Sequence, residues 1–126
     1  MAENAPWTYD PSNIFARILR GEIPNKTVLD SAHTLAFHDI VPQAPVHVLV
    51  IPKGAYVDFA HFAAVATAEE IADFHRTCAK VCETVGLNAD GFRVIANAGA
   101  HGHQEVPHYH LHILGGRPLG PMLVRA

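Results

Sequence analysis

The histidines are the residues whose types and spacing could do chemistry in this chain. There are ten of them, and five lie within residues 101–112. His108, His110 and His112 are separated by single apolar residues. Because side chains alternate between the two faces of a strand, we expect a strand with three imidazoles in a row on one face and apolar residues on the other.

Three interpretations of this histidine row are open. It could be a solvated polar face, although such faces are normally filled with Lys, Glu and Thr. It could bind zinc, because neutral imidazole is a good zinc ligand. Alternate residues on a strand are about 6.6 Å apart, so two neighbouring histidines could share an ion with His47 or His101. His108 and His112 would be about 13 Å apart, so all three converge only if the strand bends.

The third interpretation, nucleophilic catalysis, makes better use of the row. Imidazole attacks phosphorus competently and is a good leaving group once it is protonated. Flanking imidazoles can donate hydrogen bonds to phosphoryl oxygens. The central residue, His110, would attack while its neighbours hold the phosphate. The loop 97–102 contains two glycines, and its backbone N–H groups could approach a phosphate closely.

The elements that must position these histidines follow from hydrophobic patterning. A helix is predicted over residues 13–20, with Ser12 as its cap. A stronger helix signal is the capping box formed by Thr67 and Glu70, which precedes apolar residues three and four positions apart. Strands are predicted over residues 26–30, 34–39, 47–51, 92–97 and 108–114. This order indicates an antiparallel sheet covered by helices on one face, in an α+β domain.

Two further expectations concern residues of the predicted helices. Cys78 and Cys82 lie four residues apart on an apolar stripe, so we expect both to pack in the core. His61 and His75 are predicted to be exposed or half-buried.

Composition limits the classes of function. At 126 residues, with 49% hydrophobic and 17% charged residues, the chain fits one domain. A net charge of −3 disfavours a nucleic-acid partner. The longest mainly apolar run, residues 44–52, is too short to cross a bilayer, and no signal peptide is recognised. With only two cysteines, we expect a cytoplasmic protein with no membrane partner.

Residues 108–114, His-Tyr-His-Leu-His-Ile-Leu, resemble the motif that names the histidine-triad (HIT) nucleotide-binding family. Further segments resemble its Hint branch, namely residues 14–24, 35–40, 42–47 and 49–53. The resemblance implies a five-stranded antiparallel sheet with two helices, and a homodimer whose two sheets join. On this basis the chain divides into an N-terminal arm, a HIT domain and a C-terminal tail, at residues 1–11, 12–120 and 121–126.

The resemblance also implies an activity. The Hint branch cleaves purine nucleoside phosphoramidates and acyl-adenylates to the nucleoside monophosphate through a nucleotidyl-histidine. No cofactor is required; zinc is possible but not expected. Two alternatives are kept: a dinucleoside polyphosphate hydrolase, and a nucleotide- or zinc-binding regulatory protein with weak catalysis.

Residue roles follow from the same resemblance. His110 would be the nucleophile and His112 would contact the phosphate. His108 would support the position of the nucleophile, and His47 would lie close to the cluster. Asp39 would accept hydrogen bonds from the ribose hydroxyls, as suits a carboxylate. The base pocket would be lined by Ile14, Phe15, Ile18, His38, Ile40 and Leu49, Asn97 would bond near the phosphate, and His103, Gln104 and Glu105 would complete the nucleotide site.

Two positions depart from the better-known Hint pattern. The Gly-Gln-Ser that precedes the triad in that pattern is His103-Gln104-Glu105 here. The serine is credited with helping the leaving group, whereas an ionised glutamate only accepts hydrogen bonds and repels phosphate. We therefore expect Glu105, in a closed loop beside the phosphate, to make the leaving-group step depend on pH. The C-terminal end lacks the tryptophan of the animal branch, and this end is thought to shape substrate choice across the dimer.

Overall fold

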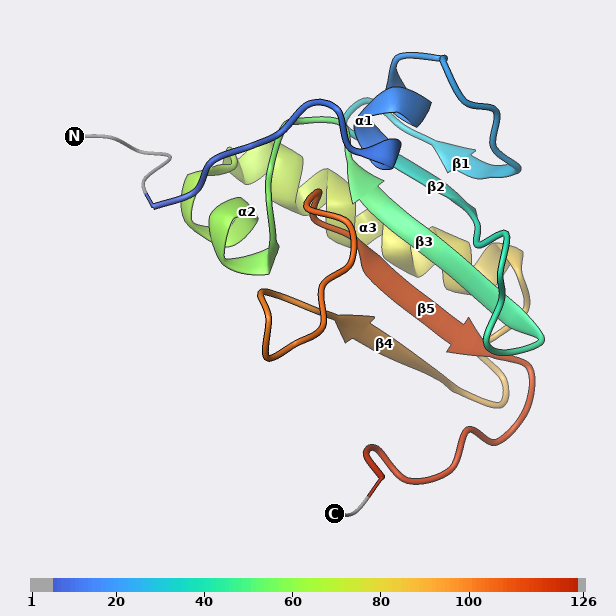
Figure 1. Cartoon of the computed structure of the whole chain (residues 1–126). Helices are drawn as coiled ribbons and strands as arrows, with labels where there is room; N and C mark the ends of the chain where they lie inside the picture. Colours follow the sequence, from blue (N-terminus) through green and yellow to red (C-terminus); the bar gives the residue numbers. More distant parts are fainter. Residues whose placement is uncertain (1–5, 125–126) are drawn as a thin grey trace.

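The computed structural model describes residues 6–124 and contains one five-stranded antiparallel sheet with the strand order β1-β2-β3-β5-β4 (Figure 1). This confirms the expected fold class. The predicted arm and tail extend into residues 1–5 and 125–126, which lie outside the described part of the chain. The elements are α1 (Ile14–Leu19), β1 (Thr27–Asp30), β2 (Thr34–His38), β3 (Val46–Pro52), α2 (Phe59–Val65), α3 (Ala68–Thr84), β4 (Phe92–Ala96) and β5 (Leu111–Gly115).

The helices differ from the prediction at two points. The cap of α1 is Asn13, whose side chain accepts a hydrogen bond from the Ala16 N–H at 2.9 Å, while Ser12 bonds to the carboxylate of Asp10 instead. The short helix α2, which Asp58 caps, was not predicted, so the described residues form three helices. The capping box at the start of α3 is present as expected.

The helices also lie on both faces of the sheet, whereas one covered face was predicted. On one face, α3 packs against alternate residues of β3 in an apolar cluster that includes Val48, Val50 and Phe74. On the other face, Phe15 of α1 packs against Leu49 and the remaining members of a smaller cluster. Figure 1 shows α3 behind the sheet and α1 in front of it. The second cluster therefore closes only part of the face on which the histidines lie.

The strand that carries the histidine row is shorter than predicted. β5 begins at Leu111, so only His112 of the row belongs to it. Both ladders of β5 end at this point, where Leu111 faces Val50 of β3 and Ala96 of β4. Farther along β3 lies Pro52, which has no N–H to donate. The Tyr109 N–H donates to the Tyr56 carbonyl, outside the sheet, at 2.7 Å. The first two histidines of the triad thus lie in the segment that precedes β5.

Three smaller expectations can be compared with the structure. Cys82 is buried in the core and the half-buried Cys78 packs against it, as expected. His75 is exposed, but His61 is fully buried, contrary to prediction, and its Nδ1 accepts a hydrogen bond from the Val57 N–H at 2.9 Å. That bond ties the imidazole of this α2 residue to the backbone just before the helix. Among the described residues, no helix is both long and apolar enough to span a membrane.

Candidate active site

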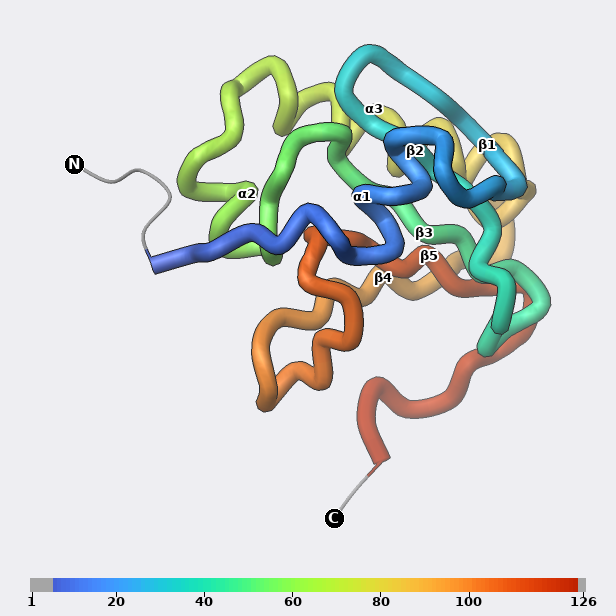
Figure 2. Tube along the Cα trace, turned by 45° about the horizontal axis from the view of Figure 1, so that its top comes forward, coloured from blue at the N-terminus to red at the C-terminus, as the bar shows by residue number. Residues whose placement is uncertain are grey.

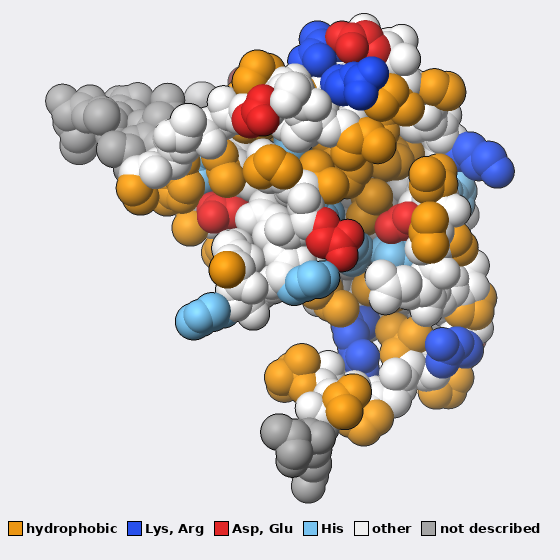
Figure 3. Space-filling view, viewed as in Figure 1, with side chains coloured by type: hydrophobic (Ala, Val, Ile, Leu, Met, Phe, Trp, Pro, Cys, Tyr) orange, Lys and Arg blue, Asp and Glu red, His pale blue; other side chains and the backbone are white. Residues whose placement is uncertain are grey.

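A cavity of about 840 Å³ opens between α1, the β2–β3 connection and the loop that joins β4 to β5. Most residues of the predicted nucleotide site line it: Ile14, Phe15, Ile18, His38, Asp39, Ile40, Leu49, Asn97, His103, Glu105, His110 and His112. The prediction missed other lining residues, among them Ile23, Phe37, Val41 and Gln43. Figure 3 views the molecule from this side, and acidic and histidine side chains lie together near the middle of the face. None of the described residues that line the cavity is a lysine or an arginine.

Three of the predicted site residues do not line the cavity. His47 and His108 are buried behind it. Gln104 ties the loop together: its amide donates to the Val57 carbonyl at 2.7 Å, and its oxygen accepts from the Gly99 N–H at 3.1 Å. The structure therefore gives Gln104 no direct access to a ligand in this cavity.

One end of the cavity is apolar. Phe15 lies edge-on to Phe37, with ring centroids 5.7 Å apart, and it also meets the His110 ring at 4.9 Å. Ile40 and Val41 are exposed at the rim, at 84% and 72%. Apolar side chains exposed beside a concave site are typical of a surface that a planar base can cover.

His110 has a proton position that its surroundings determine. Its Nδ1 lies 2.8 Å from the backbone carbonyl of His108. A carbonyl only accepts, so Nδ1 carries the proton, and Nε2 keeps a free lone pair in the neutral ring. Burial lowers the pKa of His110, which favours that neutral form. The His110 side chain is buried, which disagrees with the interpretation of the row as a solvated polar face.

His112 has the opposite arrangement, which is set by His47. The Gln43 N–H donates to His47 Nδ1 at 3.1 Å, so the proton of neutral His47 is on Nε2. That nitrogen lies 2.9 Å from His112 Nδ1, which must accept. The proton of His112 is therefore on Nε2. Burial lowers the pKa of His112 to about 4 and also lowers that of His47, so both rings are neutral at pH 7.

Asp39 lies beside this pair of rings. Its Oδ2 is 3.4 Å from His47 Nε2, and its Oδ1 accepts from the Val41 N–H at 2.9 Å. The carboxylate raises the pKa of His47, against the larger effect of burial. It stands at the cavity wall with acceptor capacity left for a ligand hydroxyl.

Asp39, His47 and His112 could also hold a metal ion, since one ligand atom from each lies within 4.8 Å of the others. This set differs from the predicted one, which combined two triad histidines with His47 or His101. Metal binding here would require His47 to lose its Nε2 proton, because that nitrogen now donates to His112. Zinc binding thus competes with the hydrogen bonds that orient His112.

The loop before the triad carries an exposed contact between a histidine and a glutamate. His103 Nε2 lies 3.0 Å from Glu105 Oε1, with side-chain exposures of 87% and 75%. His103 has a φ of 56°, in the left-handed region that favours glycine, at the position where the Hint pattern has glycine. The closed loop expected around Glu105 is absent, since its side chain is open to solvent at the cavity mouth.

Comparisons with known proteins agree on one family. The sequence profile described as HIT domain matches residues 20–119. An uncharacterised HIT-like protein of Azospirillum brasilense is 57% identical over 118 residues, covering 94% of this chain and 97% of that protein. A purine nucleoside phosphoramidase of Escherichia coli is 43% identical over 110 residues, covering 87% and 92%. A solved histidine triad protein from Clostridium difficile matches with a TM-score of 0.79 and 36% identity, covering 92% of this chain and all of that one. The chain belongs to the HIT family.

Proposed function

We propose that the protein is a nucleotide-binding hydrolase that cleaves purine nucleoside phosphoramidates or acyl-adenylates to the nucleoside monophosphate. The observation that carries the proposal is the proton position of His110. Its Nδ1–H is held by the His108 carbonyl, so a buried, neutral imidazole keeps the Nε2 lone pair at a nucleotide-sized cavity. The 43% identity to a purine nucleoside phosphoramidase supports the substrate class.

In the proposed first step, His110 Nε2 attacks the α-phosphorus. A P–N bond forms to the imidazole, and the bond from phosphorus to the amine nitrogen, or to the carboxylate oxygen of an acyl-adenylate, breaks. The electron pair of that bond leaves with the departing group, and an amine takes up a proton at the solvent-open mouth. His112 donates its Nε2–H to a phosphoryl oxygen, which stabilises the charge that develops there.

In the second step, water attacks the same phosphorus and displaces His110. A P–O bond forms, the P–N bond to the imidazole breaks, and Nε2 regains its lone pair while the proton of water is released. Asp39 accepts hydrogen bonds from the ribose hydroxyls in both steps, and the apolar end formed by Phe15 and Ile40 covers the base. No cationic side chain among the described lining residues takes part, so phosphate binding depends on imidazole and backbone donors.

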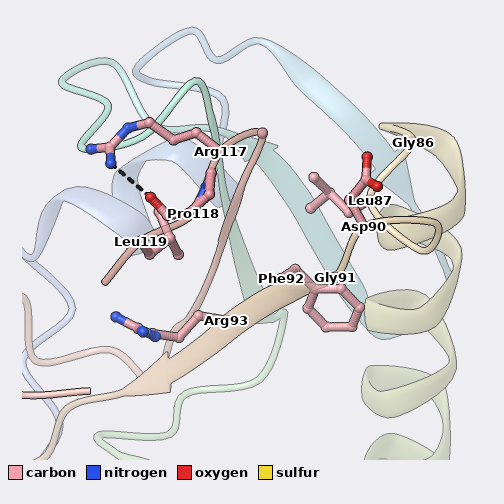
Figure 4. Close-up of a pocket in the computed structure, with 10 residues that line it drawn as sticks. Gly86, Leu87, Asp90, Gly91, Phe92, Arg93, Arg117, Pro118 and Leu119 are labelled. Carbon is pink, nitrogen blue, oxygen red and sulfur yellow. Dashed lines mark hydrogen bonds between the residues drawn. The ribbon is translucent and has the colours of Figure 1, made fainter. Parts of the chain in front are cut away.

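We also propose the homodimer that the family resemblance implies, formed along β4. β4 is an edge strand of the sheet, and its side chains Phe92, Val94 and Ile95 are exposed. An exposed apolar edge is a ready template for another strand. A second cavity, of about 640 Å³, lies beside β4 and is lined by Arg93, Arg117 and eight other residues (Figure 4). Arg93 lies there and donates to the Gly120 carbonyl, at the end of the predicted HIT domain, at 2.6 Å. The nucleotide substrate and the free thiols suit a cytoplasmic location.

Mass spectrometry of protein quenched during turnover tests the chemistry. With an AMP-amine as substrate, we expect a nucleotide adduct on His110, and no adduct in His110→Ala. A turnover panel of AMP-amines against dinucleoside polyphosphates separates the proposed substrates from the dinucleoside alternative. Turnover with no adduct on any histidine would contradict the covalent route, and metal-dependent turnover would favour a zinc protein.

A further inference from the structure

The N-terminal arm contacts the first histidine of the row. Figures 1 and 2 show it running from beside α2 to α1, and in Figure 2 it passes next to the segment that leads into β5. Trp7 stacks on the His61 ring, with centroids 4.8 Å apart and an interplanar angle of 9°. At the other end, Arg20 donates to the Pro11 carbonyl at 2.8 Å. The described part of the arm is thus held at Trp7 and at Pro11, and Tyr9 lies between them.

Tyr9 reaches the first histidine of the triad. Its hydroxyl oxygen is 2.6 Å from His108 Nδ1, and the two rings meet edge to face at 5.6 Å. The other ring nitrogen, Nε2, lies 2.8 Å from the Pro52 carbonyl. Because a carbonyl only accepts, Nε2 carries the proton of neutral His108, and Nδ1 must accept from Tyr9.

The protonation of both partners agrees with this assignment. Burial lowers the pKa of His108 to about 4, so the ring is neutral at pH 7. Burial also raises the pKa of the Tyr9 phenol, which therefore keeps its proton for donation. Both nitrogens of a fully buried imidazole are then satisfied.

We propose that Tyr9 is a positioning residue for the reaction, because its hydroxyl fixes the tautomer and orientation of His108 and thereby holds the His108 carbonyl against His110 Nδ1. The proposal rests on the proposed function of His110. With the His108 ring pinned at both nitrogens, its backbone carbonyl stays 2.8 Å from His110 Nδ1. If that carbonyl moves away, the His110 proton can shift to Nε2, and the nucleophilic lone pair is lost.

Tyr9 acts at a distance from the ligand, which makes the effect separable from binding. Tyr9 is not among the residues that line the cavity. Removing its hydroxyl therefore leaves Asp39 and the apolar end of the cavity, which would bind the nucleotide, in place. Loss of the hydroxyl should therefore lower kcat and leave nucleotide affinity unchanged.

The test compares Tyr9→Phe with wild type and with Thr8→Ala, an exposed neighbour on the same arm. We expect Tyr9→Phe to lower kcat about tenfold, the size of one lost hydrogen bond to a buried group. The dissociation constant for AMP should stay within about twofold. Thr8→Ala should match wild type in both. Unchanged kcat in Tyr9→Phe would overturn the proposal, as would a loss confined to AMP affinity.

Long-range ¹H–¹⁵N spectra of the imidazoles give a readout that folding alone would not move. In wild type, His108 should be a single Nε2–H tautomer and His110 a single Nδ1–H tautomer. In Tyr9→Phe, the His108 Nδ1 resonance should shift and His110 should populate both tautomers. A wild-type spectrum with the His108 proton on Nδ1 overturns the inference even if Tyr9→Phe does not fold. Wild type with these tautomers but no turnover would instead count against the proposed function.

Discussion

The two faces of the sheet are completed by different kinds of interaction. Toward α3, Val48 and Val50 of β3 are fully buried against Phe74 in one continuous apolar cluster. On the other face, Phe15 covers only part of the sheet, and a cavity remains beside His110. There, buried ring nitrogens are held by hydrogen bonds: His110 Nδ1 by the His108 carbonyl, and His112 Nδ1 by the His47 ring. The first face supplies stability through packing, and the second fixes the positions of protons.

On the second face, the two histidines His110 and His112 also differ from each other in their hydrogen bonds. His110 donates a hydrogen bond from Nδ1–H to a carbonyl, whereas His112 accepts a hydrogen bond at Nδ1 from His47. Two histidines that are two residues apart thus present opposite chemistry at Nε2, a lone pair and a proton. Mutations on the histidine face should therefore change mainly the reaction rate, and mutations on the face that packs against α3 should change mainly the stability.

The largest effect is expected for His110→Ala. Removing the nucleophile should lower kcat by at least about 10³-fold. AMP affinity should persist, since Asp39 and the apolar end remain. Steady-state kinetics and calorimetric titration with AMP measure the two quantities. Because the imidazole is buried against Phe15, a moderate fall in Tm is also expected. Near-wild-type turnover in this variant would remove His110 from the mechanism.

Phe74→Ala tests the opposite face. Phe74 is fully buried and packs against Phe62 and Tyr109. Truncation should lower the free energy of unfolding by about 3–5 kcal/mol, measured by urea denaturation. The kcat of the folded fraction should stay close to wild type. A large loss of kcat at full folding would show that the two faces are coupled, contrary to the comparison.

Several elements could be predicted from the sequence because their signals are local. The α3 capping box and the period of its apolar residues involve neighbours in the chain, and both were right. The start of β5 was wrong because it is set by where the ladders with β3 and β4 end, at Val50 and Ala96, and neither partner is a neighbour of Leu111 in the sequence. Helix α2 was missed because a short apolar run has no clear helical period.

The features of the candidate site also divide into those with a local sequence signal and those that depend on distant residues. The triad motif pointed to His110, since motif residues are adjacent in sequence. The bond between His47 and His112 joins residues 65 apart, and the Tyr9 bond to His108 joins residues 99 apart. Such contacts exist only after folding, so no spacing rule could have predicted the tautomers that they fix.

Acid should lower the free energy of unfolding because of the buried histidines. The pKa values of His108 and His112 fall from 6.5 to about 4 in the folded state. Between these values the unfolded chain binds more protons, so stability present above pH 6.5 is lost as pH falls toward 4. We expect the free energy of unfolding to drop by at least about 2 kcal/mol over this range. Urea denaturation at pH 7 and pH 4.5 measures it.

A matched control separates these buried rings from the rest of the protein. His112→Asn should reduce the dependence on pH, whereas the same change at the exposed His75 should leave it intact. An equal dependence on pH in both variants would mean that other groups cause the acid sensitivity.

His47→Phe tests the relay that sets the tautomer of His112. The variant keeps a ring of similar size but removes the Nε2–H that donates to His112 Nδ1. The His112 proton can then move to Nδ1, and the donor to the phosphoryl oxygen is lost. We expect kcat to fall about 10- to 100-fold, with the His110 adduct still detectable. A wild-type rate would show that His112 does not depend on His47 for its proton.

The smallest effect is expected at Glu105. Its exposed carboxylate pairs with His103, another exposed side chain, so the pair itself contributes little to stability. Its negative charge nevertheless stands at the mouth of a cavity that must admit a phosphate. Glu105→Gln removes the charge and keeps the shape, and it should lower KM for an AMP-amine by up to about threefold at low salt.

Salt distinguishes this charge effect from a role in proton transfer. Repulsion across a solvent-open mouth is screened over about 8 Å at physiological ionic strength, so wild type and Glu105→Gln should converge in KM as salt is raised. Proton donation by Glu105 would instead appear in kcat, would persist at high salt, and would change the alkaline limb of the pH–rate profile. Because the carboxylate is open to water and the closed loop is absent, we expect the alkaline limbs of the two proteins to superimpose. Divergent limbs at high salt would restore Glu105 as an acid in the leaving-group step.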